Sequence, residues 1–163
     1  MAFLKKKLSD CQGLTLLEMI IALAILAVLA TAIVPMAEVT FKRTKELELR
    51  RSLRTIRTAI DAYKADYDKA VAEKKIIASI DESGYPEDLQ ALIEGSDWGG
   101  LYEQNRRYLR RIPRDPFDKN EEGWGLRAYA DEYDSTVWGG QDVYDVYSQS
   151  DQIGLDKTAY SSW

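Results

Sequence analysis

Three residues near the N-terminus have chemistry that stands out: Gly13, Leu14 and Glu18. Glu18 is the only charged residue in a run, residues 14–37, that is otherwise apolar apart from two threonines. A bare carboxylate at bilayer depth is costly, so it should have a partner or a function. If the chain is cut after Gly13, Leu14 gains a free amine, and in lipid an amine and a carboxylate neutralise each other best when neighbouring subunits pair them. A cut between Gly13 and Leu14 would therefore give Glu18 a partner and a role in assembly.

A helix must position these groups. The apolar run would extend roughly 36 Å as a helix, at about 1.5 Å per residue, enough to cross a bilayer core of about 30 Å with some tilt. Lipid offers no other partner for backbone polar groups, so a transmembrane helix is expected over 14–37. Pro35 lies near the end of this run, and a proline removes a helical hydrogen bond, so we expect a kink there.

No catalytic constellation is found elsewhere. The chain has no histidine, and its one cysteine, Cys11, precedes the predicted cut, so the processed chain would have neither thiol nor disulfide. No Gly-rich phosphate loop or zinc spacing is present, and we expect a non-enzyme. A cluster of Asp61, Asp66 and Asp68 is interpreted as a solvated helix face. The net charge of -5, which becomes about -7 when the three lysines and one aspartate before the cut are removed, argues against nucleic acid.

An amphipathic pattern follows the apolar run. Apolar residues recur at steps of three and four, which predicts that the helix continues to about Val71 with this stripe packed on a domain. The stripe comprises Leu49, Leu53, Ile56, Ile60, Tyr63, Tyr67 and Val71. Charges of both signs lie between 42 and 51. They fit either a solvated face, with Lys42/Glu46 and Glu46/Arg50 pairs four residues apart, or salt bridges between subunits.

The remainder of the chain predicts short elements. A short helix is expected over Glu87–Ile93, with Gly95 ending it. Residues 108–117 should be extended, because prolines restrict the residues before them. Residues 124–130 and 142–148 are rich in Tyr, Val and Trp and predict two strands, with a turn at Gly139-Gly140. A long helix followed by strands predicts an α+β fold.

Two stretches resemble a known family. Lys5-Lys6-Lys7, then Gly13-Leu14-Thr15-Leu16-Leu17-Glu18 and the long apolar helix, resemble the class III leader and N-terminus of type IV pilins and type II secretion pseudopilins. Pro35 falls where that family carries a helix-kinking proline. Tyr108–Phe117 resembles the major (G-type) pseudopilin, although the family's usual Gly-Asn is replaced by Asp118–Glu122. The absence of a cysteine from the processed chain also favours a pseudopilin.

The resemblance implies a pilin-like α+β fold with a leader at 1–13, a transmembrane and filament-core helix at 14–37 and a periplasmic domain at 38–163, whose own helix spans 38–74. A prepilin peptidase would cut after Gly13 and methylate Leu14. The subunit would sit in the bacterial inner membrane as a single-pass protein, with a cytoplasmic N-terminus. It would form a homopolymer in a pseudopilus. Further implied partners are an assembly platform with its ATPase, minor pseudopilins and an outer-membrane secretin.

Two alternatives stay open at this stage: a type IV pilin that forms surface fibres, and a membrane-anchored periplasmic binding module.

The resemblance also implies a calcium site. G-type pseudopilins hold calcium in the loop after the last strand, and here that loop offers Asp151, Asp156 and Ser148. Calcium prefers six to eight oxygen ligands with prominent carboxylates, and this loop has only two. The other interpretation is a polar loop fixed by hydrogen bonds and by packing of Trp163.

Overall fold

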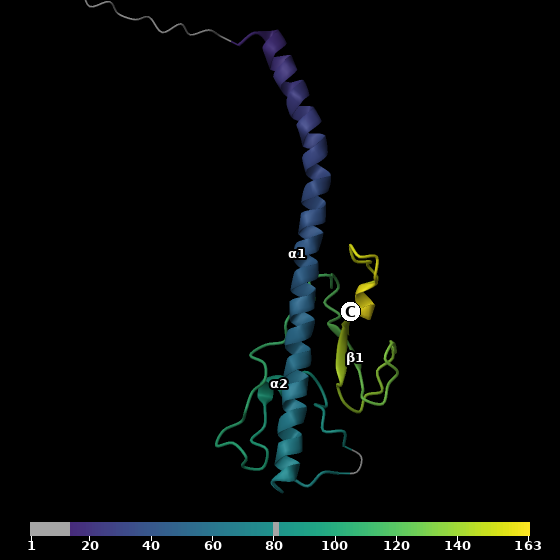
Figure 1. Ribbon diagram of the computed structural model, residues 1–163. Helices are drawn as coiled ribbons and strands as arrows, with labels where there is room; N and C mark the ends of the chain where they lie inside the picture. The colour runs from purple at the N-terminus through teal and green to yellow at the C-terminus, as the bar shows by residue number, and fades with distance from the viewer. Residues whose placement is uncertain (1–13, 80–81) are drawn as a thin grey trace, which may run out of the picture. The chain divides into compact units, whose positions relative to one another are not determined.

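The computed structural model describes residues 14–79 and 82–163. The described residues form two compact units that divide between Phe41 and Lys42. The elements, coloured by residue number in Figure 1, are α1 (Leu16–Ala72), α2 (Ala91–Glu94), β1 (Trp124–Arg127), β2 (Asp145–Ser148) and the 3-10 helix η1 (Tyr160–Ser162). A long N-terminal helix with a small antiparallel sheet confirms the predicted α+β, pilin-like fold class.

The first unit is the apolar part of α1. Its large apolar side chains are exposed, from Leu14 (70%) to Phe41 (73%). This helix is long and apolar enough to cross a membrane, with a mean hydropathy of 2.7 over its most apolar window. The helix continues through Pro35. Although Pro35 has no backbone N–H to donate, α1 does not end there. A bend of the helix at Pro35 stays a prediction.

The second unit is built on the rest of α1. The predicted stripe is confirmed in its central part, where four aliphatic residues, Leu49, Leu53, Ile56 and Ile60, are almost fully buried. They form one core with apolar residues of α2, β2, η1 and the intervening loops, including Leu92, Phe117, Val143, Val146 and Tyr160. α1 ends at Ala72, one residue after the end that the apolar stripe predicts and two residues before the end given with the family resemblance. The 3.6-residue period of a helix is why its buried face could be read from the sequence.

Strands β1 and β2 pair antiparallel, with Trp124 opposite Ser148 and Gly125 opposite Tyr147. Glycine is required at 125, because a Cβ there would lie 2.3 Å from the Tyr147 ring. The structure thus places both strands inside the predicted ranges. In Figure 1, β1 lies alongside the part of α1 that belongs to this unit.

The predicted strand lengths were wrong, for a local reason. Asp131 accepts the backbone N–H of Ala128 at 2.7 Å and that of Gly139 at 3.0 Å, so the chain turns away from the ladder after β1. Before β2, Asp142 accepts the N–H of Tyr129 at 2.8 Å. These carboxylates replace the ladder partners that longer strands would need. A loop that contains Gly139 and Gly140, rather than a tight turn, connects the strands.

The short helix begins later than predicted. α2 starts at Ala91, whose N–H donates to the Asp88 carboxylate at 2.8 Å. It ends at Glu94, one residue after the predicted end, and Gly95 stops it as predicted, with φ 72°. A side chain at this position would clash, since a Cβ there would lie 2.3 Å from the Arg106 carbonyl oxygen. Gly95 therefore meets both a conformational and a steric requirement.

Candidate functional site

The start of α1 holds Leu14 and Glu18 of the predicted processing and assembly site, whereas Gly13 lies outside the described residues. Thr15 is the residue before the helix, and its side-chain oxygen accepts the Glu18 N–H at 3.2 Å. A threonine followed three residues later by a glutamate is the capping-box spacing. Sequence reasoning treated Thr15 only as a polar exception in an apolar run and missed this cap. The T-x-x-E spacing was the signal that could have revealed it.

Glu18 lies in the first turn of α1, where a carboxylate interacts favourably with the positive end of the helix dipole. Its side chain is exposed, as are those of Leu14 and its apolar neighbours. Within the described residues, no side chain bonds to the Glu18 carboxylate. A charged group and an uncovered apolar surface thus occur together at the helix start. This arrangement suits a contact made with something outside the chain.

The structure places Ser148, one predicted calcium ligand, inside the domain. Ser148 is fully buried and its hydroxyl donates to the Asp115 carboxylate. The other oxygen of Asp115 accepts the N–H of Phe117 at 2.7 Å. Asp115 itself is buried, so this group joins the Pro113–Phe117 segment to the end of β2. Ser148 therefore has a structural partner, while Asp151 is exposed.

Asp156, the second predicted carboxylate ligand, also has partners. It accepts hydrogen bonds from the hydroxyl of Thr158 at 2.6 Å and from its N–H at 3.0 Å, and Arg50 reaches it at 3.2 Å. The bonds from Thr158, and then the charge of Arg50, lower the pKa of Asp156. Trp163 donates its indole N–H to Thr158 and lies under the Arg50 guanidinium, 4.1 Å from the ring centroid.

These contacts match the interpretation of a polar loop fixed by hydrogen bonds and Trp163. Two of the three predicted calcium ligands already have partners, because Ser148 donates to Asp115 and Asp156 pairs with Arg50. A calcium ion would have to replace the contact with Arg50. Across the part of the chain that the structure describes, no group of three or more His, Cys, Asp or Glu residues could hold a metal ion. Calcium binding by this loop stays a prediction for titration to test.

Glu46 of α1 holds the C-terminal segment. This carboxylate is 8% exposed and accepts the Leu155 N–H at 2.7 Å and the Tyr160 hydroxyl at 3.0 Å. Tyr160 stacks on Phe117, with ring centroids 4.1 Å apart. Burial, and then the bond to Glu46, raise the pKa of Tyr160. Glu46 therefore connects α1 to Tyr160, a core residue that lies far away in the sequence.

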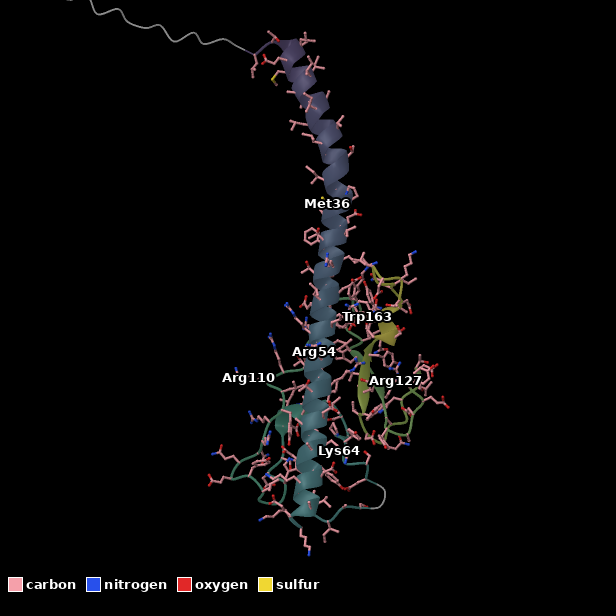
Figure 2. The ribbon with its side chains drawn as sticks, in the orientation of Figure 1. Met36, Arg54, Lys64, Arg110, Arg127 and Trp163 are labelled. Carbon is pink, nitrogen blue, oxygen red and sulfur yellow. The ribbon has the colours of Figure 1, made fainter. Side chains whose placement is uncertain are left out.

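Arg57 of α1 makes a second set of contacts. Its guanidinium donates to Asp145 at 2.6 Å, to the Val146 carbonyl at 3.0 Å and to the Trp163 carbonyl at 2.8 Å. Figure 2 shows Trp163 on the same side of α1 as Arg127, whose guanidinium also approaches Asp145, at 3.7 Å. Arg57 thus connects the helix, β2 and the C-terminal segment.

Both sequence interpretations of the charges between 42 and 51 missed these contacts. Glu46 does not pair with Lys42 or Arg50 but bonds to the C-terminal segment. Lys42 donates to the Ile153 carbonyl at 2.6 Å, and Arg50 pairs with Asp156. We name Lys42, Glu46, Arg50 and Arg57 the C-terminal clamp.

The interpretation of the aspartate cluster on α1 as a solvated face was wrong for one member. Asp66 is buried and accepts the hydroxyls of Tyr102 at 2.8 Å and Tyr108 at 2.7 Å, while Arg106 pairs with it at 3.1 Å. Burial and the bond to Asp66 raise the pKa of Tyr108. Asp66 therefore joins α1 to the Tyr102–Tyr108 segment through buried hydrogen bonds and an ion pair.

The comparisons with known proteins bear on the N-terminus. Residues 8–34 match the model of the prokaryotic N-terminal methylation motif, which includes Gly13, Leu14 and Glu18. Neither the comparison with curated proteins nor that with solved structures found a significant match. The matched motif supports a type IV pilin-like subunit, a class of structural proteins that a prepilin peptidase processes and that assemble into filaments.

Proposed function

We propose that this chain is a structural subunit of the periplasmic pseudopilus of a type II protein secretion system. The observation that carries the filament role is the helix start, where Glu18 and the uncovered apolar beginning of α1 lie within the matched methylation motif. The choice of a secretion filament rests on the resemblance of Tyr108–Phe117 to G-type pseudopilins. The subunit waits in the inner membrane with its domain in the periplasm. An assembly platform and its ATPase then extract it into a homopolymeric filament, together with minor pseudopilins, beneath an outer-membrane secretin.

Processing prepares the helix start for assembly. Cleavage after Gly13 leaves the Leu14 amine one residue before the Thr15 cap. Because Thr15 stays with the product, its bond to the Glu18 N–H still begins the helix after the cut. In the membrane the Glu18 carboxylate has an unfavourable environment, and in the filament it meets the amine of a neighbouring subunit. An uncompensated buried charge is thereby replaced by an ion pair.

The segment that resembles G-type pseudopilins favours secretion over surface fibres. Its prolines and aspartate have structural roles in this domain. The Trp124 indole N–H donates to the Pro113 carbonyl at 2.8 Å, and buried Asp115 bonds to Ser148. Absence of a cysteine after Gly13 agrees with the same choice. The second candidate is a type IV pilin that forms surface fibres, which the helix start supports equally.

A substitution at Glu18 tests the assembly mechanism. Glu18→Ala should leave cleavage and methylation intact but abolish or greatly slow filament formation, because no carboxylate is left to meet the neighbour's amine. Intact mass of the membrane-extracted protein reports the loss of residues 1–13 and the added methyl, and sedimentation reports filaments. Glu103→Ala, which removes an exposed carboxylate of the second unit outside the 42–51 charge cluster, is the control. Normal filament yield from Glu18→Ala would refute the pairing.

A clean deletion distinguishes the two filament types. Loss of specific secreted proteins with surface fibres intact would establish the secretion role. Loss of fibres with an unchanged set of secreted proteins would establish the type IV pilin and exclude the pseudopilus.

A further inference from the structure

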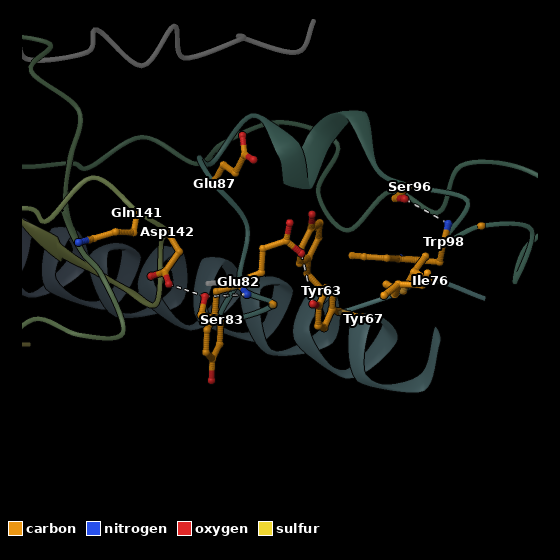
Figure 3. A pocket seen from close by; sticks show the side chains of 14 residues that line it. Tyr63, Tyr67, Ile76, Glu82, Ser83, Glu87, Ser96, Trp98, Gln141 and Asp142 are labelled. Carbon is orange, nitrogen blue, oxygen red and sulfur yellow. Dashed lines mark hydrogen bonds between the residues drawn. The ribbon is translucent and has the colours of Figure 1, made fainter. Parts of the chain in front are cut away.

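A cavity of about 390 Å³ lies in the second unit between α1 and the loops that follow it. Its walls are aromatic, with Tyr63 and Tyr67 from α1, Tyr85 from the next loop and Trp98 from beyond α2. Figure 3 shows Trp98 and Ile76 toward one end and Asp142 and Gln141 toward the other. This volume is in the range of pockets that bind small groups, and the three tyrosine hydroxyls give it polar edges. The Trp98 indole N–H donates to the Tyr108 hydroxyl at 2.7 Å, so Trp98 contributes its ring.

The charge of the lining has one sign. Among the described residues, those that line the cavity include Glu82, Glu87 and Asp142 but no lysine or arginine. Burial, followed by the charges of Glu87 and Glu82, raises the pKa of Tyr63, and burial followed by Glu82 raises that of Tyr67. The hydroxyls therefore stay neutral and the cavity presents carboxylates against aromatic rings. Such a combination attracts cations.

Two of these carboxylates are available to a ligand. Asp142 is buried and already accepts the Ser83 hydroxyl and the Tyr129 N–H. Glu82 is exposed and receives only a long bond of 3.4 Å from the Tyr67 hydroxyl, and Figure 3 shows its side chain reaching toward that ring. Glu87 is exposed, and within the described residues it has no ion-pair partner.

The neighbouring rings already attract one cation of the chain itself. The Lys64 ammonium lies 5.6 Å from the centroid of Tyr67 and 5.8 Å from that of Tyr85. Its charge is balanced outside the cavity, because Lys64 pairs with Asp68 four residues along α1. Glu82 and Glu87 are left without a matching positive charge.

We propose that this cavity binds a guanidinium group between its aromatic walls and the carboxylates of Glu82 and Glu87. A guanidinium is planar, stacks on aromatic faces and presents a fork of donors to carboxylates, whereas an ammonium is a strongly hydrated point charge. Two sources share this chemistry: a free small molecule, and an arginine side chain of a neighbouring copy of this chain. Exposed arginines such as Arg51 and Arg54, which form no ion pair within the described residues, could supply the second source. Binding of a neighbouring copy's arginine depends on the proposed function, whereas binding of a free small molecule does not.

The experiment uses the full chain in detergent micelles, labelled with 5-fluorotryptophan. The fluorine signal of Trp98 is assigned by its loss in Trp98→Phe. Titration with Nα-acetyl-arginine amide should shift that signal saturably, and the neutral isostere Nα-acetyl-citrulline amide should not. Glu82→Gln should raise the Kd about threefold, and the double change with Glu87→Gln about tenfold, because exposed ion pairs are individually weak. Glu103→Gln, an exposed glutamate outside the cavity lining, is the matched control.

Each outcome decides the proposal. A saturable shift that the double variant weakens supports it. No saturable shift, an equal response to the citrulline compound, or an unchanged Kd in the double variant would overturn it. Agmatine, a free guanidinium compound, separates the sources in a second arm. If agmatine binds at least as well as the capped residue and the double variant still forms normal filaments, the ligand is a small molecule. Weaker filaments together with preference for the capped residue indicate a neighbouring copy. Because binding is measured without filaments, failure here leaves the proposed function standing.

Discussion

Replacing Glu46 by alanine should destabilise the domain more than any other single change in the C-terminal clamp. The carboxylate is 8% exposed and one of its oxygens accepts two hydrogen bonds, from Leu155 and Tyr160. The change removes the acceptor but leaves both donors in place. After the substitution the two donors differ in their access to water, because Tyr160 is fully buried while Leu155 is 42% exposed.

These contacts set the expected magnitude. A hydrogen bond to a charged group contributes about 1.5–3 kcal/mol, and a buried donor left without an acceptor carries its desolvation penalty as well. Because Leu155 is 42% exposed, we expect water to reach its N–H once the carboxylate is removed, so the loss of this bond lies near the lower end. We expect Glu46→Ala to lower the free energy of unfolding by about 3 kcal/mol. Glu46→Gln, which keeps an acceptor oxygen, and Tyr160→Phe, which removes one bond, should each cost about 1–1.5 kcal/mol.

Urea denaturation of the full chain in micelles, followed by near-UV circular dichroism, measures these values. All ten tyrosines and four tryptophans lie after residue 41, so the tyrosine and tryptophan bands of the signal report the second unit. Glu48→Ala, an exposed neighbour on α1, should change the stability by less than about 0.5 kcal/mol. A double-mutant cycle of Glu46→Ala and Tyr160→Phe should show a coupling above about 1 kcal/mol. Additive changes, or a loss below about 1 kcal/mol for Glu46→Ala, would refute the reasoning.

Three further outcomes are expected. Asp115→Asn should lower the free energy of unfolding by about 1–3 kcal/mol in the same assay, because the buried Ser148 hydroxyl loses a charged acceptor. Stability should fall as the pH rises above about 10, because Tyr160 has a raised pKa in the folded state and the unfolded chain loses its tyrosine protons first; Tyr160→Phe should reduce this dependence. Calorimetric titration with calcium should give no binding heat and no rise in Tm, because Asp156 already pairs with Arg50; saturable heat would restore the calcium hypothesis.

Periodicity explains what the sequence could predict of this fold. A helix buries one face every 3.6 residues, so the buried positions Leu49, Leu53, Ile56 and Ile60 could be identified from the order of residues alone. The end of α1 and the stop at Gly95 could also be predicted, because their signals lie in neighbouring residues of the sequence. The ends of the strands could not be predicted in this way, because each strand ends where a side chain, instead of the partner strand, accepts a backbone N–H. Asp131 provides that replacement through its side chain, and nothing in the alternation of residues marks it.

The clamp was invisible for a different reason. Glu46 has positive residues four positions before and after it, the ordinary pattern of a solvated helix surface. Its partners lie 109 and 114 positions away, in a segment whose path the sequence does not determine. Asp66 shows the same problem, because its tyrosine partners come from 36 and 42 residues further along. A charged residue on a helix thus gives the same local signal whether water or a distant chain segment satisfies it.

The helix start differs from these sites, because its essential signal lies within a few residues. Under the proposed function the apolar side chains of α1 move from lipid into a bundle of helices, and lipid tails are about as apolar as leucine. Those side chains therefore gain little on assembly, although they decide membrane insertion. Glu18 differs from them, since its carboxylate is unfavourable in lipid and is neutralised by a neighbour's amine in the filament. Under the proposed function, Glu18 thus contributes a free-energy difference between the stored and the assembled subunit that the apolar side chains do not. A single sequence can reveal this residue without any distant contact.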